Sequence, residues 1–230
     1  MTERPDVAQV RRGAVLFDLD GTLADTAPDM AYALNRLLAR RERPPLPFEH
    51  IRPKVSHGGR AMIGIGFGLG PEDAEFNSLR QEFLDIYADN LVRETALFPG
   101  MSDLLDYFET QDIPWGIVTN KPAWLTDPLM QGLGLSERAA CVVSGDTTSR
   151  AKPYPEPLYH ACNLIDVDPS DCWYVGDAER DIAAGRAAGT GTLVALFGYL
   201  GAEEDPQAWG ADGMIRKPLD MLDWLRPKKP

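Results

Sequence analysis

The chain has 230 residues, of which 44% are hydrophobic, so it can form one large domain or a large and a small one. Its formal net charge of -12 argues against a surface that binds nucleic acid or an anionic membrane. Its three cysteines have neither disulfide nor zinc spacing, and no stretch is long and apolar enough to span a bilayer or serve as a signal peptide. We therefore expect a reduced, cytoplasmic protein.

The first predicted strand, residues 14–18, is apolar and ends in two carboxylates, Asp18 and Asp20. Alternate side chains of an extended chain share a face, so these two carboxylates are expected to point together. Adjacent like charges are costly unless a cation or a shared proton relieves them. Gly21 permits a sharp turn, and Thr22 adds a hydroxyl that we expect to contact the substrate. The pattern suits nucleophilic attack by a carboxylate, a second carboxyl as proton shuttle and Mg²⁺, although a plain capped turn stays open.

The next interval, residues 26–95, interrupts the alternation of strands and helices. It contains two long helical patterns, 28–41 and 72–92, without a convincing strand, and it is too long for an ordinary connection. We expect an inserted helical cap domain that can close over the site and exclude water. Its hinges are predicted at Pro28 and at residues 95–100, and the remainder forms a discontinuous α/β core of residues 1–25 and 96–230.

Substrate choice is predicted to reside in this cap. The sequence VSHGGR at residues 55–60 indicates a flexible turn with an imidazole, a guanidinium and exposed backbone amides. We expect His57, Gly59 and Arg60 to contact the substrate, with Arg60 paired to a carboxylate, although Arg60 could equally be solvated. The later alternating glycines do not fit a dinucleotide fingerprint and indicate packing or mobility within the cap, at Gly64, Gly66, Gly68 and Gly70.

The rest of the chain alternates strands and helices. Further strands are predicted at 113–119, 139–144, 171–176, 191–197 and, more weakly, 213–216. Helices are predicted between them at 101–110, 123–132, 156–164 and 179–188. The strands are rich in Val, Ile and Leu without polar alternation, as strands buried on both faces are. Right-handed crossovers then give a doubly wound, mainly parallel sheet with its ligand crevice at the carboxyl ends of the strands.

Polar side chains follow three of these later strands. Thr119 and Asn120 end the second strand and can hold a phosphoryl oxygen, and Lys152 follows the third in a loop stiffened by proline. Asp177 and Asp181 follow the next strand, with Asp177 placed either as a helix cap or as a metal ligand. Together these residues supply the groups that phosphoryl transfer with Mg²⁺ uses.

Four motifs in this order resemble the haloacid dehalogenase-like hydrolase superfamily, in its phosphoglycolate phosphatase-like branch with a helical cap: DLDGTLADT, VTN, AKP and GDAERD. The resemblance implies a Rossmann-like core, with Asp18 as the nucleophile that becomes aspartyl-phosphate and Asp20 as general acid-base. It also implies Thr119 and Lys152 as holders of phosphate and charge. Mg²⁺ would be bound by Asp18, the backbone carbonyl of Asp20 and Asp177, with Asp181 as a further or supporting ligand.

The implied function is Mg²⁺-dependent hydrolysis of a small carboxylate-bearing phosphate monoester by a monomer or homodimer. The segments WGIVTNKP, LFPG and WGAD resemble the sequences of phosphatases that act on N-acetylmuramic acid 6-phosphate. They resemble those of 2-phosphoglycolate phosphatases to the same degree. Asp20 disfavours dehalogenase and phosphonate-cleaving chemistry. A sugar-phosphate mutase on the same core stays open, as does, from another class, a non-enzymatic phospho-acceptor or binding module.

Overall fold

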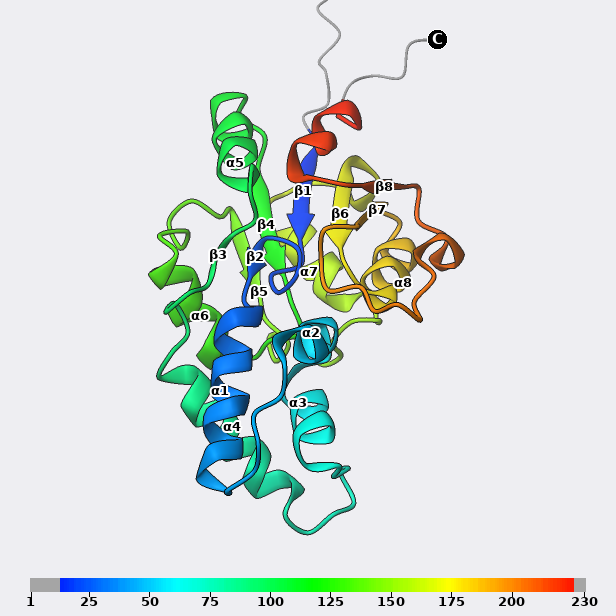
Figure 1. The fold of residues 1–230 in the computed structure, drawn as a ribbon. Helices are drawn as coiled ribbons and strands as arrows, with labels where there is room; N and C mark the ends of the chain where they lie inside the picture. The colour runs from blue at the N-terminus through cyan, green and yellow to red at the C-terminus, as the bar shows by residue number, and fades with distance from the viewer. Residues whose placement is uncertain (1–12, 226–230) are drawn as a thin grey trace, which may run out of the picture.

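The computed structural model describes residues 13–225 as an α/β sheet region joined to a group of helices (Figure 1). Within that range the main sheet has six parallel strands in the order β5-β4-β1-β6-β7-β8. Their bounds are β1 Ala14–Phe17, β4 Trp115–Val118, β5 Cys141–Val143, β6 Cys172–Gly176, β7 Gly191–Ala195 and β8 Gly213–Ile215. All six lie within the predicted ranges, which confirms the doubly wound parallel sheet. Strand β1 is central, with Leu16 level with Gly116 of β4 and Tyr174 of β6.

Helices cover both faces of this sheet. On one face, Val15 and Phe17 of β1 belong to the same core as α5 (Met101–Thr110) and α6 (Ala123–Gly132). On the other face, Ala14 and Leu16 pack with α7 (Glu156–Leu164) and α8 (Glu179–Ala188). Successive side chains of a strand point to opposite faces, so an apolar run such as β1 buries both. The four helices coincide with the predicted ones.

Four cap helices lie between residues 26 and 95: α1 Ala27–Arg40, α2 Phe48–Ile51, α3 Gly58–Phe67 and α4 Phe76–Ala88. Helices α1 and α4 correspond to the two predicted helical patterns, whereas α2 and α3 were not predicted. A 3₁₀ helix, Arg52–His57, joins α2 to α3, so the prediction of a flexible turn at residues 55–60 was wrong. The physical reason is helical spacing of buried apolar residues on this segment, at Ile51, Val55, Met62 and Ile63.

One of the alternating glycines has a packing role within the cap. A Cβ atom on Gly66 of α3 would lie 2.8 Å from Cδ1 of Leu34 in α1, so glycine allows the two helices to approach closely. This contact supports the packing interpretation for Gly66. No helix within residues 13–225 combines the length and the hydropathy needed to cross a membrane.

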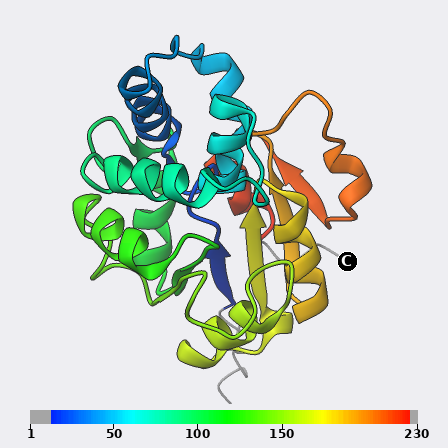
Figure 2. The ribbon, with the colours of Figure 1, turned by 90° about the horizontal axis from the view of Figure 1, so that it is seen from below.

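Two short strands, β2 (Ala24–Asp25) and β3 (Ala96–Leu97), pair antiparallel where the chain enters and leaves the cap helices. The buried carboxylate of Asp29 accepts hydrogen bonds from the backbone N–H groups of Glu94 and Thr95 and from the Thr95 hydroxyl, at 2.7–3.0 Å. The two connections are therefore tied together. Pro28, expected as a hinge, lies in the first turn of α1, where proline is tolerated, directly after β2. In Figure 1 the arrow of β1 points toward the cap helices, and Figure 2 shows those helices in front of the sheet.

Candidate active site

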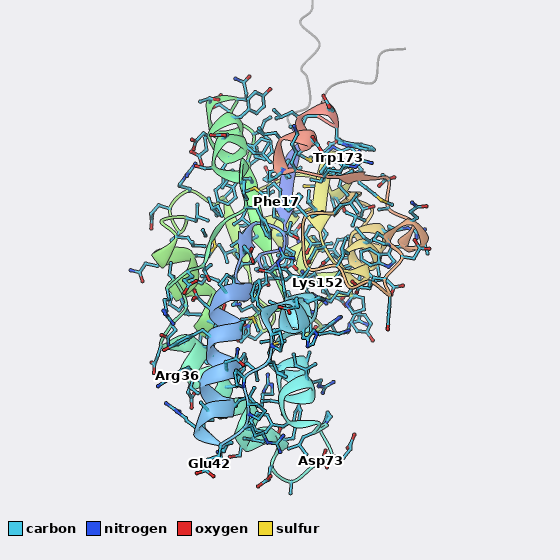
Figure 3. The ribbon with its side chains drawn as sticks, viewed as in Figure 1. Phe17, Arg36, Glu42, Asp73, Lys152 and Trp173 are labelled. Atoms are coloured by element: carbon cyan, nitrogen blue, oxygen red, sulfur yellow. The ribbon has the colours of Figure 1, made fainter. Side chains whose placement is uncertain are left out.

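A pocket of about 690 Å³ separates the carboxyl ends of the strands from the cap helices. Seven of the residues predicted for the site line it: Asp18, Asp20, His57, Gly59, Arg60, Thr119 and Asn120. The other predicted charged residues, Lys152, Asp177 and Asp181, are buried beside Asp18. Thr22 is buried outside the pocket lining, and its hydroxyl has no hydrogen-bond partner. Figure 3 shows Lys152 where the sheet region meets the cap, far from Glu42 and Asp73 at the other end of the cap.

The turn after β1 places Asp18 at the pocket floor. The strand ends at Phe17, so strand alternation does not align Asp18 with Asp20 as expected; the following turn brings both to the pocket. Gly21 makes this turn with φ +84°, a conformation that disfavours other residues. A Cβ atom on Gly21 would also lie 2.1 Å from Oδ2 of Asp177. Glycine therefore lets the first motif pack directly against the last.

Lys152 is fully buried and holds the nucleophile candidate. Its Nζ lies 2.9 Å from Oδ1 of Asp18 and 2.7 Å from Oδ1 of Asp181. Nζ also donates to the backbone carbonyl of Val118 at 2.8 Å. A buried charge is tolerated when it is paired and hydrogen-bonded, as here. Asn120, expected to contact the substrate, uses its side-chain amide to bond both the N–H and the C=O of Lys152, at 3.0 and 2.9 Å.

Three buried carboxylates form a compact acidic cluster. Asp18, Asp177 and Asp181 each present an oxygen, and these atoms lie within 4.8 Å of one another. Oδ2 of Asp177 accepts hydrogen bonds from the Ser56 hydroxyl (2.8 Å) and the Tyr199 N–H (2.9 Å), whereas Oδ1 is buried without a partner. An unpaired buried carboxylate oxygen is costly. Several carboxylate oxygens in one place are the ligands that hard divalent cations prefer, so this donor set fits Mg²⁺.

Asp177 does not cap α8. Ala178 occupies the cap position, and its N–H donates to Oδ2 of Asp181 at 3.0 Å. The interpretation of Asp177 as a helix cap was therefore wrong, and Asp181 satisfies the helix end instead. Helix capping therefore does not explain why Oδ1 of Asp177 is buried without a hydrogen-bond partner.

Protonation in the cluster reflects burial and crowding. Burial and the negative charges of Asp18 and Asp181 raise the pKa of Asp177 to about 7. Burial also raises the pKa of Asp18, against the opposing effect of Lys152. Burial opposes ionisation of Asp181 as well, but Lys152 and Arg180 outweigh it and lower the pKa of Asp181. All three carboxylates are fully ionised at neutral pH only if a further positive charge joins them.

Asp20 stands apart from this cluster and has different partners. Its Oδ1 accepts hydrogen bonds from the Thr26 hydroxyl at 2.6 Å and from Nζ of Lys121 at 2.7 Å. Lys121 also contacts the hydroxyl of Tyr87, a residue of cap helix α4, at 3.2 Å. Burial disfavours the charge of Lys121, but Asp20 and Tyr87 outweigh it and raise the pKa of that lysine. Asp20 is thus held beside a permanent cation that also contacts the cap.

Several residues of the site were not predicted. Lys121 and Arg180 lie within the motifs VTNK and GDAERD and line the pocket. Their positions beside predicted site residues could have indicated them. Tyr87 and Ser56 come from the cap; Ser56 lies within VSHGGR, beside the predicted His57, whereas no sequence pattern marks Tyr87. The pKa of His57 is lowered by partial burial and by the positive charge of Arg180, and both side chains line the pocket.

Comparison with known proteins agrees with this geometry. Residues 15–195 match the family model described as haloacid dehalogenase-like hydrolase. An N-acetylmuramic acid 6-phosphate phosphatase of Pseudomonas putida is 43% identical over 92% of this chain and 95% of its own length. A phosphoglycolate phosphatase of Xanthomonas campestris is 42% identical over 93% and 98%, respectively.

A crystal structure described as a predicted phosphoglycolate phosphatase from Haemophilus somnus has the same fold. It superposes with a TM-score of 0.82 at 24% identity, covering 93% of this chain and 98% of that one. The family match spans both the sheet region and the cap helices. The chain therefore belongs to the haloacid dehalogenase-like hydrolase family and is a phosphatase of that family.

Proposed function

We propose that this phosphatase is Mg²⁺-dependent and hydrolyses a small carboxylate-bearing phosphate monoester through an aspartyl-phosphate on Asp18. The observation that carries the proposal is the buried cluster of Asp18, Asp177 and Asp181, in which Oδ1 of Asp177 has no partner. Lys152 adjoins this cluster, and Asp18 opens into the pocket. Residues 26–95 act as the cap that selects the substrate, over a core of residues 1–25 and 96–230.

The metal would be held by Asp18, Asp177, the backbone carbonyl of Asp20 and, directly or through a supporting contact, Asp181. When bound, Mg²⁺ neutralises charge on the transferred phosphoryl group. Lys152 also neutralises the crowded carboxylates, through its contacts with Asp18 and Asp181 at the distances given above. Thr119, buried at the end of β4 and in the pocket lining, is placed to hold a phosphoryl oxygen.

Two residues carry the bond changes. The carboxylate of Asp18 forms a bond to phosphorus while the bond from phosphorus to the leaving oxygen breaks, and the carboxyl of Asp20 gives that oxygen its proton. The Asp20 carboxylate then takes a proton from the water that attacks the phosphorus and releases Asp18. Lys121 and Thr26 fix the orientation of Asp20 for both proton transfers.

The pocket favours a substrate of sugar size. A volume of about 690 Å³ lies within the range of small-molecule sites, and a two-carbon phosphate would leave much of it to water. Its cap wall combines apolar with cationic side chains, at Val55, Phe76, Leu84, Arg60 and Arg80. N-acetylmuramic acid 6-phosphate carries a carboxylate and apolar groups that match this wall. 2-Phosphoglycolate is the second candidate, supported by relatives of equal similarity.

Phosphate release tests the proposal. We expect the wild type with Mg²⁺ to hydrolyse N-acetylmuramic acid 6-phosphate with a higher kcat/KM than 2-phosphoglycolate or glucose 6-phosphate, and chelation to abolish release. Asp18→Asn should lower kcat by at least about 10³-fold, since the nucleophile is lost. Metal-independent release, or turnover retained by Asp18→Asn, would contradict the proposal. A product that is an isomeric sugar phosphate instead of free phosphate would indicate a mutase.

A further inference from the structure

A half-buried arginine lies in the pocket wall without a fixed partner. Arg180 is in the first turn of α8, between Asp177 and Asp181, and it lines the pocket. Across residues 13–225 its guanidinium makes neither a hydrogen bond nor an ion pair. Arg60 and Arg80, which also line the pocket, are exposed side chains of the cap. The charges of Asp181, Asp18 and Asp177 act on this guanidinium without a hydrogen bond, so its five donors are available to an anionic ligand in the pocket.

The charges around Arg180 leave its own charge available. When all three are ionised, as they are with a divalent cation bound, the neighbouring carboxylates of Asp18, Asp177 and Asp181 carry three negative charges, which Lys152 and that cation would cancel. The positive charge of Arg180 then remains as a net charge at the pocket floor. A chain with a formal net charge of -12 needs such a local charge to attract an anionic substrate.

The sheet order separates Arg180 from the groups expected to hold the phosphoryl oxygens. Thr119 follows β4, Asp18 follows the central strand β1, and Arg180 comes after β6 on the opposite side of β1. His57, an exposed side chain of the cap, lines the same pocket as Arg180. A substrate with its phosphoryl group between Asp18 and Thr119 can therefore extend its remaining atoms across the pocket toward Arg180.

We propose that Arg180 determines substrate specificity by pairing its guanidinium with the carboxylate of the phosphate ester, while the phosphoryl group is held by the residues around Asp18. This inference rests on the proposed function. The planar guanidinium binds a carboxylate with two parallel hydrogen bonds, which a lysine cannot reproduce. Because Arg180 is fixed on a core helix, this recognition is built into the core and does not depend on the cap alone.

Matched substrate pairs test the proposal. N-Acetylmuramic acid 6-phosphate is compared with N-acetylglucosamine 6-phosphate, which lacks the carboxylate, and 2-phosphoglycolate with ethyl phosphate. The variants are Arg180→Gln, Arg180→Lys and, as a matched control on the same helix, Arg186→Gln. Arg186 is exposed outside the pocket lining, with the backbone carbonyl of Trp209 as its hydrogen-bond acceptor.

We expect Arg180→Gln to lower kcat/KM by about 10- to 100-fold for the carboxylate-bearing member of the pair and by less than about threefold for the other. Arg180→Lys should recover only part of the loss, and Arg186→Gln should behave as the wild type. Equal losses for both members would overturn the inference, since Arg180 would then serve the phosphoryl group or the metal site. No loss for either member would overturn it as well. A wild type that releases phosphate from none of the four esters would overturn the proposed function and this inference with it.

Discussion

The two carboxylate oxygens of Asp177 have different surroundings, and this difference supports its role as a proposed metal ligand. One of its oxygens is held by Ser56 and by the backbone of Tyr199, and the other is buried without a donor. Burial and two neighbouring carboxylates raise its pKa to about 7, so the metal-free protein carries a proton on this side chain over a wide pH range. A divalent cation must displace that proton.

This displacement predicts a pH-dependent response to metal. The folded protein holds the Asp177 proton up to about pH 7, whereas the unfolded chain releases it near 3.8. The folded state therefore binds more protons between these values, and the stability of the metal-free protein falls as pH rises through them, by on the order of 4 kcal/mol from this group. Binding of Mg²⁺ to the ionised carboxylate should offset this loss of stability. We expect the Tm difference between Mg²⁺ and chelator to be larger at about pH 8 than at about pH 5.

Asp177→Asn provides the control for this measurement. The amide keeps the shape of the side chain but does not titrate, so both the pH trend and most of the response to Mg²⁺ should disappear. A metal-induced Tm shift that is the same at all pH values would contradict the assignment of Asp177 as a ligand.

Individual residues could be predicted where a strand runs into a polar motif, as for Asp18, Asp20, Thr119 and Asp177. The role of Asn120 could not, because its amide bonds the backbone of a residue 32 positions away. Thr22 was expected at the substrate and is buried outside the pocket lining, because the turn at Gly21 directs the chain away from it. Such details depend on three-dimensional neighbours that spacing in the sequence does not reveal.

Helices and strands were easiest to predict where they are long and have a regular spacing of apolar residues. Core helices such as α5 and α8 have apolar faces at helical spacing, and the six parallel strands are continuous apolar runs. Helix α3 was missed because its sequence, GGRAMIGIGF, contains four glycines, which lower helix propensity. Strands β2 and β3 have two residues each, too few for any periodicity. The elements that connect the cap to the core were therefore the least predictable.

The 3₁₀ helix Arg52–His57 connects the cap to the proposed metal site through Ser56. Its hydroxyl donates to Oδ2 of Asp177 at 2.8 Å, so it fixes the orientation of a proposed ligand. Ser56→Ala should raise the Mg²⁺ concentration for half-maximal activity by about fivefold, the value of one hydrogen bond, with little change in kcat at saturating Mg²⁺. Ser56→Thr, which keeps the hydroxyl, is the matched control. An unchanged Mg²⁺ requirement in Ser56→Ala would show that this contact does not serve the metal.

The whole molecule brings together residues from distant parts of the sequence. The first, second and last motifs directly follow the neighbouring strands β1, β4 and β6, the third lies in the loop after β5, and the cap lies over those strand ends (Figure 2). Cap and core also meet through Arg52, which donates to the backbone carbonyl of Gly198 at 2.9 Å. Positive side chains gather in or beside the pocket although the chain as a whole is acidic, at Arg60, Arg80, Lys121, Lys152 and Arg180. This arrangement suits an anionic substrate held between core and cap.

In the proposed reaction, Asp18 carries the phosphoryl group during turnover. The direct measurement uses the Asp20→Asn variant, Mg²⁺ and 4-nitrophenyl phosphate, whose leaving group needs no proton, followed by rapid quenching, digestion and mass spectrometry. Loss of the base that activates water should let the phospho-enzyme accumulate, with one phosphoryl group on the peptide that contains Asp18. The double variant Asp18→Asn/Asp20→Asn should show none. A phosphoryl group on any other residue, or nitrophenol release without a phosphorylated peptide, would contradict the account.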